Sequence, residues 1–406
     1  MHRFRRPFRS SLLAAVTVVA GGMLAGCAKD APQDLFRPAG ENARNIDEGL
    51  GGQRYLFYLS GVVTLIVFGL ISYILVKYKD RGQETPEQTH GNPKLEIALT
   101  VLPAIILATI AVPTVVKIFE LDERSDTQCI VNVTGQQWWW EYEYPAGKCG
   151  DVDIAEPIIT SGELVIPADT DVLLRLTSRD VIHSFWIPRL NGKRDAVPGR
   201  THTLRMEADE PGLFAGQCTE FCGLSHARMR QAAVALYSSD FQTWVDNQLA
   251  AYTPPAQGSV AADGEATFIA QCSRCHLVND LSDGGEPVVP NPAANLVSAS
   301  APNLSKLMTR TAFAGWTFDL ISEECRDRLW NAAPEEFGAM YLAGVTPECF
   351  DESELRAWLR NPPAMKPMFV DPNNLESTGG LYRGMPNLGL TEAQIDELIA
   401  YLLERK

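Results

Sequence analysis

Residues 216–230 read GQCTEFCGLSHARMR and carry four soft or borderline metal ligands close together. The ligands are the thiols of Cys218 and Cys222, the imidazole of His226 and the thioether of Met229. Soft sulfur ligands select copper or iron–sulfur chemistry over magnesium or calcium, and imidazole suits copper, zinc and iron. The stretch therefore predicts a copper site.

A CxxxC pair also occurs in disulfides and in zinc sites, so both remain alternatives for these cysteines. A structural zinc site closes with four Cys or His ligands and does not use Met. A weak axial Met beside Cys and His is typical of electron-transfer copper, so Met229 favours copper. A further ligand is expected upstream, and His183 in DVIHSFWIP is the candidate. A satisfied core or loop histidine is the alternative there.

Length, charge and cysteine usage limit the class of protein. A chain of 406 residues has room for two or three domains of about 100–200 residues. A net charge of −15 disfavours non-specific binding to nucleic acid. The nine cysteines fall into pairs apart from Cys27, which indicates an oxidising compartment or metal sites.

Residues 1–26 are expected to be a signal sequence, because a basic start is followed by an apolar run from Leu12. The tetrapeptide LAGC at residues 24–27 resembles a bacterial lipoprotein box, which would be cleaved before Cys27 and lipidated on it. The mature amino terminus is therefore expected outside the cytoplasm.

Two uncharged stretches, residues 55–76 and 97–116, are each long enough to cross a hydrocarbon core of about 30 Å as a helix. They predict a transmembrane hairpin over residues 50–120. The loop between them carries Lys77, Lys79, Arg81 and Lys94, which agrees with a cytoplasmic loop. Two spans return the chain to its starting side, so everything after about residue 120 is expected outside.

Residues 125–238 contain short β-rich runs broken by turn residues, a pattern that favours a β-sandwich. The runs are CIVNVT, WWWEYEY, DVLLRLTS, HTLRMEA and QAAVALYS. Cys129 and Cys149 flank two of these runs and are predicted to form a disulfide, with a free buried pair as the alternative. A helix and a Pro/Gly/Ala-rich linker are expected over residues 239–262.

Residues 263–406 are mostly helical in pattern and carry the sequence CSRCH, which is the signature of covalent c-type haem. Thioether bonds to Cys272 and Cys275 and axial ligation by His276 are expected. A Met as sixth ligand would raise the haem potential, and Met385 is preferred over Met368. Cys325 and Cys349 lie in an expected insertion and are a second candidate disulfide. A capping box, Thr391 with Gln394, predicts the terminal helix.

Several motifs in order resemble subunit II of haem–copper cytochrome c oxidases, in the bacterial variety with a cytochrome c fused at the carboxyl end. They are LPAIILA, GQQWWWEYEY, DVIHSFWIP, DAVPGR and GQCTEFCGLSHARM. The resemblance implies a two-helix transmembrane hairpin, a cupredoxin-like β-sandwich and an all-α class I cytochrome c domain.

The resemblance also implies roles for individual residues. The site would be the binuclear copper centre CuA, with bridging thiolates from Cys218 and Cys222. Terminal and weak ligands would be His183, His226, Met229 and the carbonyl of Glu220. The Glu220 carboxylate would bind magnesium at the boundary with subunit I, although a solvated loop carboxylate is the alternative.

Two further roles come from the same resemblance. Trp138 would be the point where electrons enter from cytochrome c, and Glu96 would stand at the entrance of a proton path into subunit I. An ordinary packing tryptophan and an ordinary interfacial charge are the respective alternatives. The family usually has His at Gln136 and Tyr at Trp139, so donor docking is expected to differ.

The resulting prediction is a membrane-anchored subunit of a proton-pumping terminal oxidase in the bacterial inner membrane. Electrons would pass from an external donor, such as a cytochrome c or a bc-type complex, through haem c and CuA to subunit I. Subunit III is a further expected partner. A copper chaperone would not need CxxCH or a two-span hairpin, and a nitrous oxide reductase needs a large His-rich domain that six histidines do not supply.

Overall fold

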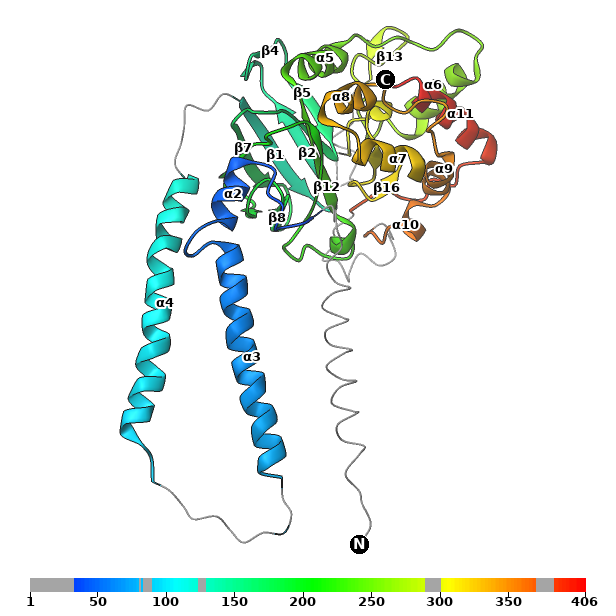
Figure 1. Ribbon diagram of the computed structural model, residues 1–406. Helices are drawn as coiled ribbons and strands as arrows, with labels where there is room; N and C mark the ends of the chain where they lie inside the picture. The colour runs from blue at the N-terminus through cyan, green and yellow to red at the C-terminus, as the bar shows by residue number, and fades with distance from the viewer. Residues whose placement is uncertain (1–32, 80–81, 83–89, 123–128, 289–300, 370–382) are drawn as a thin grey trace.

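The computed structural model describes residues 33–79, 82, 90–122, 129–288, 301–369 and 383–406. The expected signal sequence and the lipid site at Cys27 lie outside the described residues. Two long helices, α3 (Gln53–Lys77) and α4 (Pro93–Asp122), extend together from one side of the folded body (Figure 1). Both are long and apolar enough to cross a membrane, and their candidate spans are not buried within the protein. The short α2 (Glu41–Asp47) precedes them and packs against both.

The middle of the chain is a β-sandwich, as the short alternating runs predict. One sheet has the order β10-β7-β1-β2-β5 and the other has the order β11-β12-β6. Their bounds are Cys129–Gln136 for β1, Trp139–Tyr144 for β2, Ile158–Ser161 for β5, Val172–Ser178 for β7, His202–Met206 for β10, Glu163–Pro167 for β6, Gly212–Gln217 for β11 and Arg230–Leu236 for β12. Residues alternate between buried and half-buried along most of β1, because one face of the strand packs on the core.

Two small hairpins complete the sandwich. β3 (Gly147–Cys149) pairs with β4 (Val152–Ile154), and β8 (His183–Phe185) pairs with β9 (Arg194–Ala196). The predicted disulfide between Cys129 and Cys149 is present. It joins the start of β1 to the end of β3, and the core between the sheets is filled by large side chains such as Trp140 and Tyr142.

The C-terminal unit, defined here as the described residues from 260 onward, is mainly helical. Its helices are α6 (Val260–Gln271), α7 (Glu323–Trp330), α8 (Pro334–Leu342), α9 (Glu352–Arg360), α10 (Pro362–Met365) and α11 (Glu392–Leu403), with the 3₁₀ turn η2 (Leu307–Thr309). The capping box of α11 forms as predicted, and Cys325 is bonded to Cys349.

This unit departs from the all-α expectation in two short strand pairs, β13–β14 (Ser282–Asp283, Glu286–Pro287) and β15–β16 (Ala312–Phe313, Phe318–Asp319). Gly284 and Gly285 both adopt positive φ, which is the backbone that a two-residue hairpin turn requires. Local turn chemistry therefore overrides the helical pattern there.

The linker is shorter than its composition suggests. Helix α5 (Ser238–Leu249) is followed by residues 250–259, and α6 already begins at Val260 because the Ser259 hydroxyl accepts a hydrogen bond from the amide of Ala262. Residues 260–262, expected in the linker, are helical. Helices α7 and α8 pack against β11, so the C-terminal unit lies directly on the sandwich (Figure 1).

Candidate metal centre and adjoining cavity

The ligand-rich stretch forms the connection between two paired strands of the smaller sheet. β11 ends at Gln217 and β12 begins at Arg230, and the loop between them contains the 3₁₀ turn η1 (His226–Arg228). The amide of Cys218 donates to the carbonyl of Met229, and that of Thr219 donates to the carbonyl of Ser184. These bonds close the loop and attach it to β8, which carries His183.

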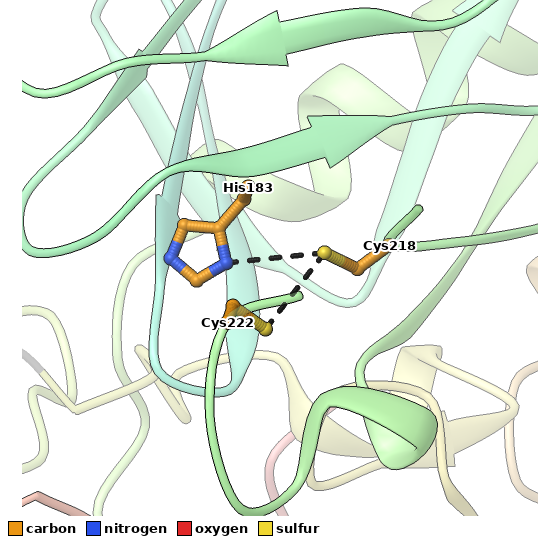
Figure 2. A group of neighbouring side chains, drawn as sticks. All are labelled: His183, Cys218 and Cys222. Atoms are coloured by element: carbon orange, nitrogen blue, oxygen red, sulfur yellow. Dashed lines mark hydrogen bonds between the residues drawn. The ribbon is translucent and has the colours of Figure 1, made fainter. Parts of the chain in front are cut away.

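The predicted ligand atoms lie in one connected group. The Cys218 Sγ is 3.9 Å from both the Nδ1 of His183 and the Sγ of Cys222, as Figure 2 shows. It also lies 3.3 Å from the carbonyl oxygen of Glu220. The Cys222 Sγ lies 3.5 Å from the His226 Nδ1 and 3.8 Å from the Met229 Sδ. All six residues predicted from the sequence are therefore brought together.

The tautomer of His183 suits a metal ligand. Its Nε2 lies 2.8 Å from the Asp180 carboxylate, which as an ionised acceptor requires a proton on that nitrogen. Nδ1, which faces Cys218, is then left with its lone pair. Gly135 permits this arrangement, because a Cβ at that position would lie 2.9 Å from the His183 ring.

Asp180 was missed by the sequence reasoning. Its side chain is only 3% exposed and also accepts a hydrogen bond from the amide of Gln137, so it connects the predicted ligand His183 to the chain that precedes Trp138. The sequence feature that could have indicated this role is the position of Asp180, three residues before His183 in a turn that follows a strand.

The pKa values of the two thiols are shifted in opposite directions. The contact between the two sulfurs, together with His183, lowers the pKa of Cys218, and the same contact raises the pKa of Cys222. A site that already favours one thiolate is prepared for a soft cation, because the thiolate is the form that binds metal. The donor set of two thiols, two imidazoles and a thioether fits copper.

A separate cavity of about 720 Å³ opens in the C-terminal unit. Cys272, Cys275 and His276 line it, and both cysteines are free thiols. Of the five methionines that follow the CSRCH motif in the sequence, Met368 and Met385 line this cavity, whereas Met308, Met340 and Met365 do not. Met385 Sδ accepts a hydrogen bond from the Trp358 indole, and its amide lies 3.4 Å from Met368 Sδ.

Two groups that line this cavity fit a haem. The Nδ1 of His276 donates to the Pro302 carbonyl at 2.8 Å, which leaves Nε2 as the ligand atom, and desolvation lowers the pKa of this imidazole. Arg310 is buried and its Nε has no partner within the described part of the chain. Its terminal nitrogens donate to two uncharged acceptors, the Ser161 hydroxyl and the Asn303 carbonyl, so the remaining Nε–H of this guanidinium suits a carboxylate such as those that a haem carries.

The cavity reaches the sandwich at Trp138, which forms part of its wall. Trp138 is only 2% exposed, and its indole nitrogen donates to the Cys222 carbonyl at 3.0 Å. Its carbonyl accepts a hydrogen bond from Lys366, and its ring lies 5.4 Å from that of Phe369. One side chain thus touches both the cavity and the ligand loop.

The remaining predicted residues occupy varied positions. The Glu220 side chain is exposed although its carbonyl faces Cys218. Glu96 lies in the first turn of α4, at the end remote from the sandwich. Gln136 and Trp139 are both buried.

Lys366, which the sequence did not single out, is buried at the contact between the sandwich and the C-terminal unit. This burial lowers the pKa of Lys366 to about 7.

A two-helix anchor followed by a β-sandwich with a sulfur- and imidazole-lined metal site defines the class of membrane-anchored metal electron-transfer proteins. The family models for the periplasmic and transmembrane domains of cytochrome c oxidase subunit II match residues 129–235 and 46–116. The chain belongs to the cytochrome c oxidase subunit II family and is a component of a haem–copper oxidase. The periplasmic domain of this family implies a binuclear CuA centre, with which the His183, Cys218 and Cys222 cluster is compatible.

Relatives match over most of both chains. Cytochrome c oxidase subunit 2 of Alkalihalophilus pseudofirmus is 33% identical over 277 residues, which cover 66% of this chain and 77% of the relative. The subunit of Bacillus sp. strain PS3 is 33% identical over 342 residues, which cover 80% and 79% respectively. The periplasmic domain of subunit II from Bradyrhizobium japonicum matches 30% of this chain and 95% of its own length, at 30% identity and a TM-score of 0.27.

Proposed function

We propose that this subunit receives electrons from an external donor at a haem c in its C-terminal unit and passes them through CuA to subunit I. The observation that carries the proposal is Trp138, which lines the cavity beside the CxxCH motif and donates a hydrogen bond to the backbone of Cys222. A single residue therefore joins the two places where redox centres are expected.

The proposed CuA ligands are the six residues of the loop and β8: His183, Cys218, the Glu220 carbonyl, Cys222, His226 and Met229. When bound, a copper pair would supply a one-electron centre. The chain holds these ligands rigidly, because the loop is closed by the Cys218–Met229 hydrogen bond and His183 is oriented by Asp180. Fixed ligands suit electron transfer, since little rearrangement then accompanies a change of charge.

The proposed haem c attachment uses Cys272 and Cys275, with His276 and Met385 as axial ligands. Haem would add a second one-electron centre, and His–Met ligation raises its potential. The protein excludes water from this site with an apolar wall that includes Phe268, Trp358 and Leu398.

The partners follow from the family and the anchor. Subunit I, where oxygen is reduced to water, and subunit III would contact the membrane helices, and the oxidase would pump protons across a bacterial inner membrane. The sandwich and the C-terminal unit would lie on the periplasmic side. The exposed Glu220 carboxylate is proposed to bind magnesium at the subunit I boundary, since magnesium prefers hard oxygen ligands.

The cofactor content of the purified oxidase tests the proposed function. We expect two coppers per copy of this chain beyond those of subunit I, a mixed-valence electron spin resonance signal and one covalently attached haem c. Metal analysis, resonance spectroscopy and a haem stain after denaturing electrophoresis measure these directly. One copper or none in this chain, or haem that is lost on denaturation, would contradict the proposal.

Replacing Glu96 by alanine is expected to slow turnover while leaving the CuA and haem c spectra unchanged. An ionisable group at the edge of a span is a candidate for proton collection, and Glu96 lies at the end of α4 remote from the sandwich. Glu120→Ala, at the opposite end of α4 and also exposed, is the matched control. Turnover and proton release by reconstituted oxidase are the measurements, and equal activity in both variants would reject the role.

A further inference from the structure

The contact between the sandwich and the C-terminal unit contains a carboxylate that has no role in either proposed redox site. Glu163 begins β6 and is only 1% exposed. An isolated buried carboxylate is unfavourable unless it is well hydrogen-bonded. The partners of Glu163 therefore determine whether this part of the sandwich is stable.

All the hydrogen bonds recorded to this carboxylate come from the C-terminal unit. Its Oε1 accepts from the Thr311 amide at 2.9 Å, from the Thr311 hydroxyl and from the Trp316 indole at 3.2 Å. Its Oε2 accepts from the Tyr341 hydroxyl at 2.9 Å. Burial raises the pKa of Glu163, and these bonds oppose that rise. The carboxylate is satisfied when the two units are docked.

A second buried contact supports the same arrangement. The Arg310 guanidinium donates to the Ser161 hydroxyl at 2.9 Å, only two residues from Glu163. A third contact is made by the Lys366 side chain, which donates to the carbonyls of Trp138 and Ala314. Both Arg310 and Lys366 line the cavity, together with Trp138 and Ser161 of the sandwich.

We propose that Glu163 is a positioning residue, which latches the C-terminal unit onto the sandwich and holds the CxxCH cavity in a fixed position against Trp138. The electron-transfer part of this inference rests on the proposed function. If the linker alone joined the two units, haem c and CuA would meet only as often as their effective concentration allows. In a fixed interface the two units stay in contact, so electron transfer between the two centres does not depend on diffusion of one unit toward the other.

The first test measures docking without reference to cofactors. Hydrogen exchange of the intact oxidase, followed by mass spectrometry, reports on the segment around Thr311. In Glu163→Ala the Thr311 amide should exchange about 10–100-fold faster, the factor that corresponds to leaving a buried donor without its acceptor. Glu163→Gln keeps an acceptor for Thr311 and Trp316 and should be protected as in the wild type. Glu156→Ala removes an exposed carboxylate from the same sandwich and is the control.

The second test measures the rate of electron transfer from haem c to CuA. Haem c is photoreduced in the full complex, and the reduction of CuA is followed over time. The wild-type rate should not change with solvent viscosity. Glu163→Ala should slow the step and make it viscosity-dependent, because the two units must then reach the transfer geometry by diffusion, with unchanged haem and CuA spectra. Tyr341→Phe, which removes one bond and little volume, should show the same trend more weakly.

The outcomes separate the two proposals. Missing haem or copper in the wild type refutes the proposed function, whereas intact cofactors with unchanged exchange and rate in Glu163→Ala refute the latch. If Glu163→Gln exchanges as fast at Thr311 and transfers electrons as slowly as Glu163→Ala, the hydrogen bonds that glutamine retains do not hold the two units together, and the latch is also overturned.

Discussion

Replacing Cys218 by serine should abolish copper binding and reduce oxygen consumption by the oxidase at least about 100-fold, since even the loss of groups that only orient ligands costs about 10–100-fold. Cys218 is central to the ligand group, because its sulfur lies near His183, Cys222 and the Glu220 carbonyl. Serine supplies a hard, protonated oxygen that is a poor ligand for copper. Copper analysis and electron spin resonance on the purified variant are the measurements.

The haem absorption of this variant is the internal control, because Cys272 and Cys275, which line the cavity, belong to the C-terminal unit and not to the sandwich. Haem c should remain reducible by an external donor while electrons fail to reach subunit I. Retention of the full copper content and of the mixed-valence signal would remove Cys218 from the ligand set.

Met385→Ala should convert a high-potential, low-spin haem c into a form without His–Met absorption. Axial ligands set haem potentials over a range of about 0.8 V, and a His–Met pair lies toward its upper part, so a large fall in potential is expected. Electron supply to CuA should then become inefficient. The measurements are the near-infrared thioether band and a redox titration of the isolated oxidase.

Met368→Ala is the matched variant, because Met368 lines the same cavity and touches the Met385 amide through its sulfur. It should retain the His–Met band with only a modest change of potential. If the band survives in Met385→Ala and disappears in Met368→Ala, the sixth ligand is Met368.

Local features of this protein were predictable because the residues that form them are close in sequence. The capping box of α11 involves residues 391 and 394, and both spans follow from uninterrupted apolar runs. Four of the ligand side chains fall between Cys218 and Met229, so one loop carries most of the metal site. The five β-rich runs became strands, but β5, β6 and β11 were not singled out, because their short stretches lack a distinct alternation.

The docking of the C-terminal unit was not predictable in the same way. The sequence showed only a Pro/Gly/Ala-rich linker between the sandwich and the haem motif, whereas the structure has a buried interface in which Glu163 accepts a hydrogen bond from Thr311, 148 residues away. Nothing near Glu163 in the sequence distinguishes it from a solvated glutamate. Its hydrogen-bond partners come from the insertion between the haem motif and α11. The composition of that insertion gave no indication of its role.

The sequence by itself determined the chemical types of the ligands, their spacing, the CxxCH motif and the two membrane spans, since each depends on residues within a few turns of one another. The tertiary structure alone decided that His183 turns its Nδ1 toward Cys218, that Met368 and Met385 share one cavity, and that Trp138 joins this cavity to the ligand loop. The physical reason is that these contacts join remote segments, and packing and burial, rather than local spacing, select which of their atoms meet.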